Sequence, residues 1–160
     1  TSNVRKLKIA WIHQPGDITQ GLQATPLAID GVVYYIGPNN RVFALDGKTG
    51  KERWRYFAEI EESGAQSVFA GYSRGVSIGL GKVFIGSTDG RAIALDQATG
   101  KPLWSTQLTE PRKCHGCNFT SPPILAGDVL ILGPTGGDVA QAGKIYAVDA
   151  NTGAKLWEFE

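Results

Sequence analysis

One phrase recurs along the chain, and every tryptophan of the sequence belongs to it. The phrase reads Ala44-Leu-Asp-Gly-Lys-Thr-Gly-Lys-Glu-Arg-Trp54 and returns as Ala94-Leu-Asp-Gln-Ala-Thr-Gly-Lys-Pro-Leu-Trp104 and as Ala147-Val-Asp-Ala-Asn-Thr-Gly-Ala-Lys-Leu-Trp157. Its last part alone is found in Lys6-Leu-Lys-Ile-Ala-Trp11. A spacing of about 50 residues is typical of stacked supersecondary units, none of which can bury its hydrophobic face alone. The sequence therefore predicts neighbouring units packed against one another.

Composition narrows the possible partners and environments. The 160 residues carry a net charge of +1, which gives no electrostatic reason to expect nucleic acid as a partner. No apolar run is long enough to cross a bilayer, so we expect no transmembrane segment. The 21 glycines and 8 prolines are scattered at turn positions, as in a turn-rich β protein. The chain opens on Thr1 without a signal peptide and stops at Glu160 inside a predicted strand, so we expect a fragment of something larger.

Each repeat contains four short runs with strand character, separated by turn residues. The runs of the three full repeats are Ala24–Ile29, Val32–Ile36, Val42–Leu45 and Arg53–Phe57; Gly75–Leu80, Val83–Ile85, Ala92–Leu95 and Leu103–Thr106; and Pro123–Leu125, Val129–Leu132, Ile145–Val148 and Lys155–Phe159. No longer segment has apolar residues at a helical period, so we expect almost no helix. Four-stranded units with one aromatic motif each predict an all-β chain of β-propeller blades. The predicted units are a blade strand at 6–14 and blades at 22–57, 75–107 and 120–160.

The repeated phrase has a local mechanical explanation. Its aspartate can bond backbone N–H groups of its own turn, and the glycine that follows its threonine supplies the positive φ that reverses the chain. The tryptophan that follows is predicted to lie on the outer strand and to pack against the neighbouring unit. The residues concerned are Asp46, Asp96 and Asp149, and Gly50, Gly100 and Gly153.

The phrase Ala-x-Asp-x-x-Thr-Gly-x-x-x-Trp resembles the tryptophan-docking motif of the quinoprotein propellers, the family that binds pyrroloquinoline quinone (PQQ). The resemblance covers essentially the whole chain and implies about three blades plus one strand of a ring of about eight blades. It also implies a bacterial periplasmic or extracellular location. The motif occurs in propellers without a cofactor too, including an outer-membrane assembly scaffold, so function has to be predicted from site residues.

Two stretches before inner strands resemble cofactor contacts of that family. Leu22-Gln23-Ala-Thr-Pro is similar to the opening inner strand, where the family commonly has a glutamate against the quinone; Gln23 keeps the hydrogen-bonding role without the charge. Tyr72-Ser-Arg74-Gly75 is similar to the family's Asn-Arg-Gly, whose arginine contacts the quinone carboxylates. From the residues alone, Gln23 can equally be a solvated strand-start residue and Arg74 an exposed loop arginine.

The third blade carries a lengthened loop, Gly133-Pro-Thr-Gly-Gly-Asp138-Val-Ala-Gln-Ala-Gly143. It resembles the family's Gly-Ser-Ser-Gly-Ala-Glu-x-Gly loop, which implies cofactor contacts by Thr135, Gly136 and Gly137 and a Ca²⁺ ligand at Asp138. Asp138 is one methylene shorter than the family's glutamate. Thr120, just before the third inner strand, is a further candidate contact. The alternative from the residues alone is a long surface loop.

These resemblances imply part of a PQQ-dependent alcohol or sugar dehydrogenase, in which this chain supplies part of the quinone and Ca²⁺ pocket and electrons pass to a cytochrome c or a quinone. The implied partners are the remaining blades or a covering subunit. The alternative is a non-catalytic propeller that acts as a scaffold or interaction subunit. Val68-Phe69 stand where the dehydrogenases have two adjacent cysteines, so we expect no vicinal disulfide. The family's general base lies in later blades, and no catalytic residue is predicted here.

Cys114-His-Gly-Cys117 is the one cysteine motif. A c-type haem motif needs histidine directly after the second cysteine, and this chain has Asn118 there. A structural zinc site needs four ligands, and two cysteines and two histidines in the whole chain make one improbable. The helix N-terminus and βαβ context of a thioredoxin-like redox pair are missing. A disulfide in an oxidising compartment or a pair of free thiols remains. The periplasmic habit of the resembled family favours the disulfide. His13 and His115 are interpreted as ordinary polar residues.

Overall fold

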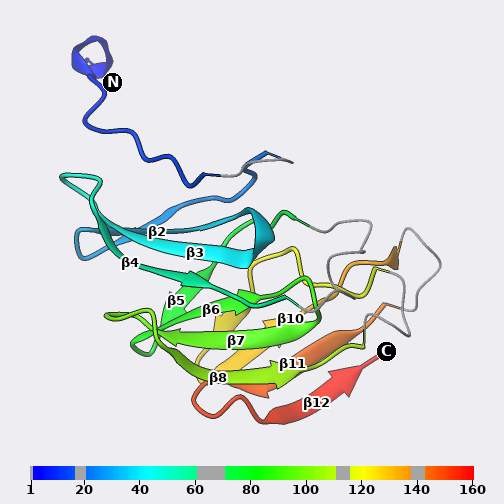
Figure 1. The fold of residues 1–160 in the computed structure, drawn as a ribbon. Helices are drawn as coiled ribbons and strands as arrows, with labels where there is room; N and C mark the ends of the chain where they lie inside the picture. Colours follow the sequence, from blue (N-terminus) through cyan, green and yellow to red (C-terminus); the bar gives the residue numbers. More distant parts are fainter. Residues whose placement is uncertain (1, 17–20, 61–70, 111–115, 138–142) are drawn as a thin grey trace.

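Three four-stranded antiparallel sheets make up the computed structural model, which describes residues 2–16, 21–60, 71–110, 116–137 and 143–160 (Figure 1). The first sheet contains β1 (Leu27–Ile29), β2 (Val32–Gly37), β3 (Arg41–Asp46) and β4 (Glu52–Phe57). The second contains β5 (Ser77–Gly79), β6 (Lys82–Gly86), β7 (Arg91–Asp96) and β8 (Pro102–Gln107). The third contains β9 (Ile124–Ala126), β10 (Val129–Leu132), β11 (Ile145–Asp149) and β12 (Lys155–Phe159). In each sheet the strands pair in chain order, as in a propeller blade.

The predicted all-β class and the near absence of helix are confirmed for the described residues. Two three-residue 3₁₀ turns, η1 (Val4–Lys6) and η2 (Pro38–Asn40), are the helical elements there. No described helix has the length and apolar content that crossing a membrane requires. The first two inner strands are shorter than predicted, and the third keeps its predicted length but is shifted by one residue. Residues before the first two bond to the next blade: the Thr25 N–H, for example, donates to the Arg74 carbonyl at 3.0 Å.

The strand predicted at 6–14 is wrong. Residues 4–6 form η1, and residues 7–15 belong to no strand. A strand is defined by a ladder of hydrogen bonds to a partner, and no described strand pairs with this segment. The chain begins away from the sheets with η1 and then runs toward the first sheet as an extended segment (Figure 1). Its tryptophan nevertheless docks as the others do, with Trp11 Nε1 donating to the Gly47 carbonyl at 3.0 Å.

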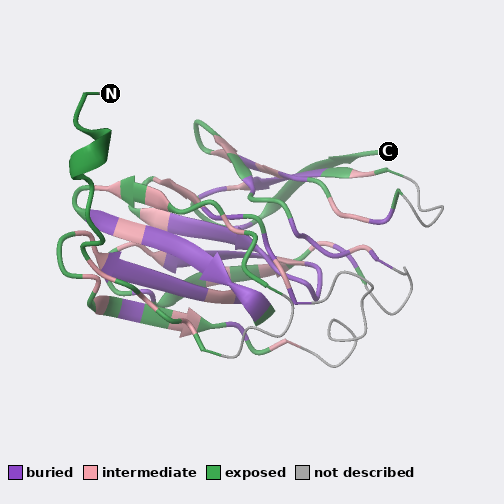
Figure 2. Cartoon of the chain, turned by 90° about the horizontal axis from the view of Figure 1, so that it is seen from above, coloured by how far each residue is buried: buried purple, intermediate pink, exposed green. Residues whose placement is uncertain are grey.

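The middle strands of each sheet carry the core (Figure 2). One cluster joins β2 and β3 to β6 and β7, and a second joins the second sheet to the third. The largest fully buried side chains include Phe43, Phe84 and Phe119. Because each sheet buries its apolar face only against the next one, stacking rather than any single sheet creates the core.

Tryptophan docking repeats at each junction, as predicted. Trp54 Nε1 donates to the Gln97 carbonyl at 3.0 Å, and Trp104 Nε1 donates to the Ala150 carbonyl at 3.2 Å. Each docked ring lies over the glycine that follows the threonine of the phrase in the neighbouring sheet. These glycines are Gly50, Gly100 and Gly153. A bulge sets the direction of each ring. The register shifts beside the pairs Ala44–Trp54, Ala94–Trp104 and Ala147–Trp157, so each large ring faces a fully buried alanine.

The aspartate of each phrase closes its own turn. Asp96 Oδ1, for example, accepts from the Ala98 N–H at 3.1 Å, from the Thr99 N–H at 2.8 Å and from the Thr99 hydroxyl at 2.7 Å. Asp46 and Asp149 accept the same three bonds in their turns. The pKa of Asp96 is lowered by the Thr99 hydroxyl and amide, that of Asp149 by the Thr152 amide and hydroxyl, and that of Asp46 chiefly by Arg53.

These lowered pKa values predict loss of stability in acid. A carboxylate whose pKa is depressed by folding stabilises the fold above its unfolded pKa, and this contribution is lost as the pH falls through the folded pKa. We expect the urea midpoint of unfolding to drop as the pH is lowered below about 4. Replacing all three aspartates by asparagine should reduce that slope. An equal slope in the wild type and the triple variant would assign the acid sensitivity to other groups.

Candidate functional site

Backbone hydrogen bonds bring three predicted contact segments together at the starts of the inner strands. The Thr25 N–H donates to the Arg74 carbonyl at 3.0 Å, and the Arg74 N–H donates to the Thr120 carbonyl at 2.7 Å. Thr25 lies two residues after Gln23 and precedes β1, while Arg74 and Thr120 precede β5 and β9. The three blades therefore present equivalent positions side by side at the starts of their inner strands.

Arg74 is tied to Thr120 through its side chain as well. Its Nη1 donates to Thr120 Oγ1 at 2.6 Å, with the arginine exposed and the threonine fully buried. The threonine hydroxyl acts as the acceptor here, so its own proton can be donated to another group. Gly75, which follows the arginine, is buried between Pro122 and the Thr25 carbonyl. The backbone of Arg74 is thus held on both sides, and its guanidinium is bonded to Thr120 while the side chain keeps contact with solvent.

The loop of the third blade reaches the same region through Asn118. The Thr135 N–H donates to the Asn118 carbonyl at 2.8 Å. The Thr135 hydroxyl contacts the Asn118 side-chain oxygen and the Gly116 carbonyl, and lies 3.1 Å from the Asn118 carbonyl. Gly136 is buried with φ of 120°, in the region that favours glycine, whereas Gly137 is exposed. Thr135 is thereby bonded to Asn118, which lies two residues before Thr120 in the chain.

Other predicted site residues are less well connected. Gln23 is exposed, and its place beside the bonded segments follows from Thr25 alone. Asp138 lies outside the described residues, as do Cys114, His115 and the Val68-Phe69 pair. In the described part of the chain, no three His, Cys, Asp or Glu side chains gather as a metal site would require. The predicted Ca²⁺ site therefore stays a prediction.

Cys117 is disulfide-bonded, which agrees with the favoured prediction for the cysteine motif. Cys114, the only other cysteine of the sequence, lies outside the described residues. The Cys117 carbonyl accepts the Thr109 hydroxyl at the end of the second blade. The disulfide thus belongs to the segment that carries Asn118 and leads to Thr120.

Sequence reasoning missed two residues of this region. Asn118 is fully buried and is the direct partner of Thr135, yet it entered the sequence analysis only as the residue that rules out a haem motif. Thr25 is a backbone link between blades. Asn118 could have been noticed as a polar residue between a cysteine and the apolar Phe119, but no local pattern identifies its partner.

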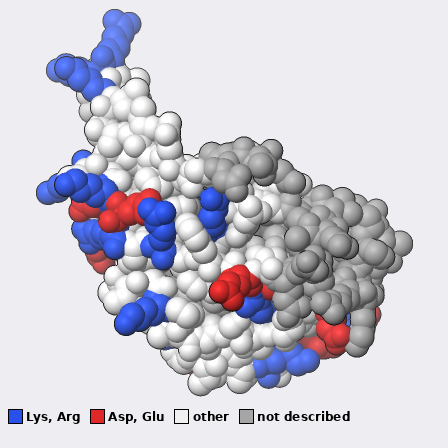
Figure 3. Space-filling model, in the orientation of Figure 1, with Lys and Arg blue, Asp and Glu red and all other residues white. Residues whose placement is uncertain are grey.

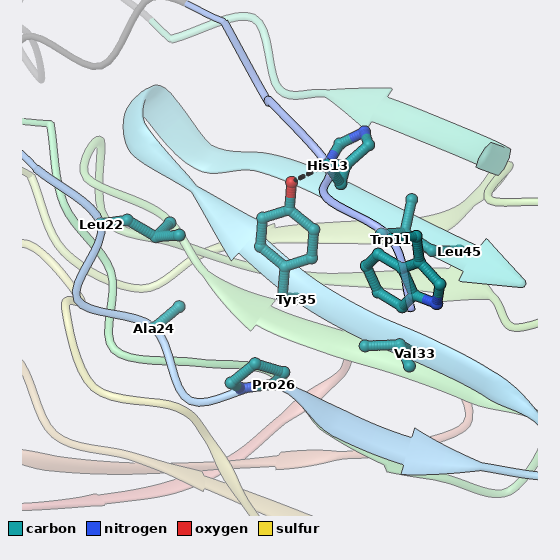
Figure 4. Close-up of a pocket in the computed structure, with 8 residues that line it drawn as sticks. All are labelled: Trp11, His13, Leu22, Ala24, Pro26, Val33, Tyr35 and Leu45. Atoms are coloured by element: carbon teal, nitrogen blue, oxygen red, sulfur yellow. Dashed lines mark hydrogen bonds between the residues drawn. The ribbon is translucent and has the colours of Figure 1, made fainter. Parts of the chain in front are cut away.

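The cavity found in the structure is a separate feature. It measures about 160 Å³ and lies between the N-terminal segment and the first sheet (Figure 4). Its lining is mostly apolar and comprises Trp11, His13, Leu22, Ala24, Pro26, Val33, Tyr35 and Leu45. At the next junction, the position that matches Val33 is Val83, which is fully buried in the cluster shared with the first sheet, whereas Val33 is half-buried. Leu45 is already fully buried, as its counterpart Leu95 is. The cavity therefore lies at a sheet junction that is only partly covered.

A polar network closes one end of that cavity. His13 Nδ1 lies 2.6 Å from the Tyr35 hydroxyl, and its Nε2 lies 2.8 Å from Glu52 Oε1. Burial and the nearby Glu52 raise the pKa of Tyr35 to about 12. A phenol with so high a pKa stays protonated at neutral pH, so it acts as a hydrogen-bonding group that helps to fix the N-terminal segment.

Charge is mixed on the face shown in Figure 3, where Lys and Arg side chains lie among Asp and Glu side chains. The N-terminal segment carries Arg5, Lys6 and Lys8.

Comparison with known proteins identifies the class to which these features belong. The family described as glucose/ethanol/alcohol dehydrogenase, β-propeller domain, with PQQ in its name, matches residues 1–160. This chain belongs to that family of PQQ-dependent dehydrogenase propellers.

Individual relatives agree with the family match. The chain is 42% identical over 159 residues to quinohemoprotein alcohol dehydrogenase ADH IIB of Pseudomonas putida, which covers 99% of this chain and 23% of the relative. The crystal structure of quinohemoprotein alcohol dehydrogenase from Comamonas testosteroni is 36% identical, with a TM-score of 0.80 over 88% of this chain and 21% of that one. A europium-containing methanol dehydrogenase is 30% identical, with a TM-score of 0.88 over 98% of this chain and 27% of that one. The chain thus spans about a quarter of the length of these proteins.

Proposed function

We propose that this chain forms one wall of a PQQ pocket in a PQQ-dependent alcohol or sugar dehydrogenase. The observation that carries the proposal is the set of hydrogen bonds that joins Thr25 to Arg74 and Arg74 to Thr120, together with the bonds of Thr135 to Asn118, two residues before Thr120. These bonds bring the family-like contact segments of three blades together at the starts of the inner strands. The family match and the alcohol dehydrogenases among its relatives support the proposal.

The chemistry of these residues fits PQQ, which carries three carboxylates on a flat ring system. Arg74 offers an exposed side chain whose guanidinium is bonded to Thr120, and Thr120 offers a buried hydroxyl. Gly136 and Gly137 allow close approach of the backbone to a flat ligand. When bound, the quinone supplies the oxidising power, while these residues bind and orient it. We propose Gln23 as an additional hydrogen-bonding contact and Asp138 as a Ca²⁺ ligand.

The wider assignments rest on the same proposal. We propose a periplasmic or extracellular location in a bacterium and a cytochrome c as one electron acceptor. The remaining blades of the protein, or a covering subunit, are proposed to cover the two ends of this stack. The apolar cavity at Trp11 supports this at one end, and the exposed Trp157 and Phe159 of β12, at 47% and 68%, support it at the other.

Titration of the full-length protein with PQQ and Ca²⁺ tests the proposal. We expect saturable binding, followed by the quinone's absorbance, and alcohol- or sugar-dependent reduction of an artificial electron acceptor. Absence of binding at saturating cofactor would reject the dehydrogenase in favour of a non-catalytic propeller. That alternative is supported by Gln23 in place of the family's glutamate and by Val68-Phe69 in place of its paired cysteines.

A further inference from the structure

Three contacts from one threonine converge on the segment Gly116–Asn118. The amide of Thr135 donates to the Asn118 carbonyl at 2.8 Å. Its hydroxyl reaches the carbonyl of Gly116 and the side-chain oxygen of Asn118. The hydroxyl has a single proton, which it donates to the Gly116 carbonyl, and it accepts from the Asn118 amide when Nδ2 is the atom that faces it. These bonds fix the rotamer of Thr135, and the backbone of Gly136 remains for contacts on the other side.

The segment that receives these bonds is itself anchored to the second blade. The Thr109 hydroxyl donates to the Cys117 carbonyl, and the Phe119 N–H donates to the Ser87 carbonyl at 3.1 Å. Cys117 is disulfide-bonded, and Asn118 and Phe119 are almost completely buried. A loop of the third blade is therefore held in place by a short cross-linked segment fixed to the second.

Asn118 is energetically unfavourable at a position that has only a structural role. One polar atom of its buried side-chain amide has no hydrogen-bond partner among the described residues. A buried polar atom without a partner destabilises a fold, whereas an apolar side chain of similar size would carry no such cost. The contact of the side-chain amide with the Thr135 hydroxyl is the one that the asparagine supplies and that an apolar residue would lose.

We propose that Asn118 and the disulfide-bonded Cys117 are positioning residues, which orient Thr135 and the following glycines for contact with the cofactor. This inference rests on the proposed function, because it assigns Thr135 to the PQQ pocket. It adds a device specific to this chain: a disulfide beside the third inner strand fixes the pocket wall through backbone carbonyls and one amide side chain.

Two variants of the full-length protein test the proposal: Asn118→Ala, and Cys114→Ser combined with Cys117→Ser. We expect each to raise the PQQ dissociation constant about tenfold, as loss of supporting contacts does at comparable sites. Combining them should give less than the product of the two effects, since both act on one element. Hydrogen exchange of the Thr135 amide should become faster in both. Two variants are used because the serine pair could prevent folding.

Thr106→Val is the matched control. The Thr106 hydroxyl also donates to a glycine carbonyl across the same two blades, at 2.6 Å from the Gly153 oxygen, but it lies on β8 away from Gly116. We expect this variant to bind PQQ within about twofold of the wild type, below the effect of one typical hydrogen bond. If Thr106→Val lost as much PQQ affinity as the Asn118 and cysteine variants, the loss in those variants would be explained by general destabilisation. That result would overturn the proposal.

Hydrogen exchange of the Thr135 amide distinguishes a failure of this inference from a failure of the proposed function. If the wild type does not bind PQQ, the dehydrogenase assignment fails, and with it the role of Thr135 as a cofactor contact. If the wild type binds PQQ but Asn118→Ala leaves both the affinity and the Thr135 exchange rate unchanged, only the positioning role is overturned. Faster exchange together with weaker binding supports it.

Discussion

Replacing Arg74 by alanine is expected to weaken PQQ binding by about a hundredfold. A charge-assisted bidentate contact contributes up to about 3 kcal/mol, which corresponds to that ratio. The backbone of Arg74 holds its neighbours through main-chain groups that alanine keeps, so the substitution removes the guanidinium and leaves the hydrogen bonds to the Thr25 and Thr120 backbones in place. The loss should therefore appear in affinity, measured by calorimetric titration, with little change in thermal stability.

Two further variants define what the arginine supplies. Arg74→Lys should recover only part of the affinity, because an ammonium group cannot make the planar two-point contact. Arg55→Ala is the control: Arg55 is an arginine on β4 that pairs with Glu52 at 2.5 Å and has a side chain 56% exposed. It should bind PQQ as the wild type does. Unchanged affinity in Arg74→Ala would remove the residue from the pocket and weaken the dehydrogenase assignment.

A methyl group added at Gly100 should be among the most damaging small changes in the fold. A Cβ there would lie 2.5 Å from Cε3 and 2.6 Å from Cδ2 of the Trp54 ring, and the backbone has φ of +72°. The left-handed conformation and the overpacking together are expected to lower the free energy of unfolding by about 3 kcal/mol. Trp54 is 9% exposed and bonded to the Gln97 carbonyl, so its ring cannot move away without uncovering the junction.

Gly81→Ala separates the two causes. Gly81 has φ of +69°, almost the value at Gly100, but nothing lies within 4 Å of its added Cβ. In this variant the free energy of unfolding should fall only by the contribution of the left-handed backbone conformation, about 1 kcal/mol. Both can be measured by urea unfolding of the full-length protein. Equal losses at Gly100 and Gly81 would show that the tryptophan ring yields and that docking contributes little to stability.

Much of the fold was predictable because its determinants are local. The Asp-x-x-Thr-Gly turn is closed by bonds from Thr49 to Asp46 and by a positive φ at Gly50, all within one short stretch. The prediction failed where a strand depends on a partner far away, as at 6–14. It also made the first two inner strands too long, because Thr25 and Arg74 bond to adjacent blades and not within their own sheets.

The candidate site was predictable only as a set of residue types. A family-like arginine and glycine-rich loop could be recognised from their neighbours in sequence. Their mutual contacts could not, since Arg74 and Thr120 are 46 residues apart and Thr135 and Asn118 are 17 apart. Asn118 was missed because a buried amide is recognised by its partner, and its partner lies in another loop.

The repeated tryptophan phrase by itself determined the blade register: where each chain reversal falls, and which residue faces the next unit. It could do so because turn bonds, glycine φ values and the alanine opposite each tryptophan act within one blade. Tertiary structure alone decided which side chains of different blades are in contact. These contacts depend on how far each sheet is offset against the next. The buried rings and apolar clusters of the two sheets together set that offset. The stacking therefore brought Arg74 to Thr120 and Thr135 to Asn118.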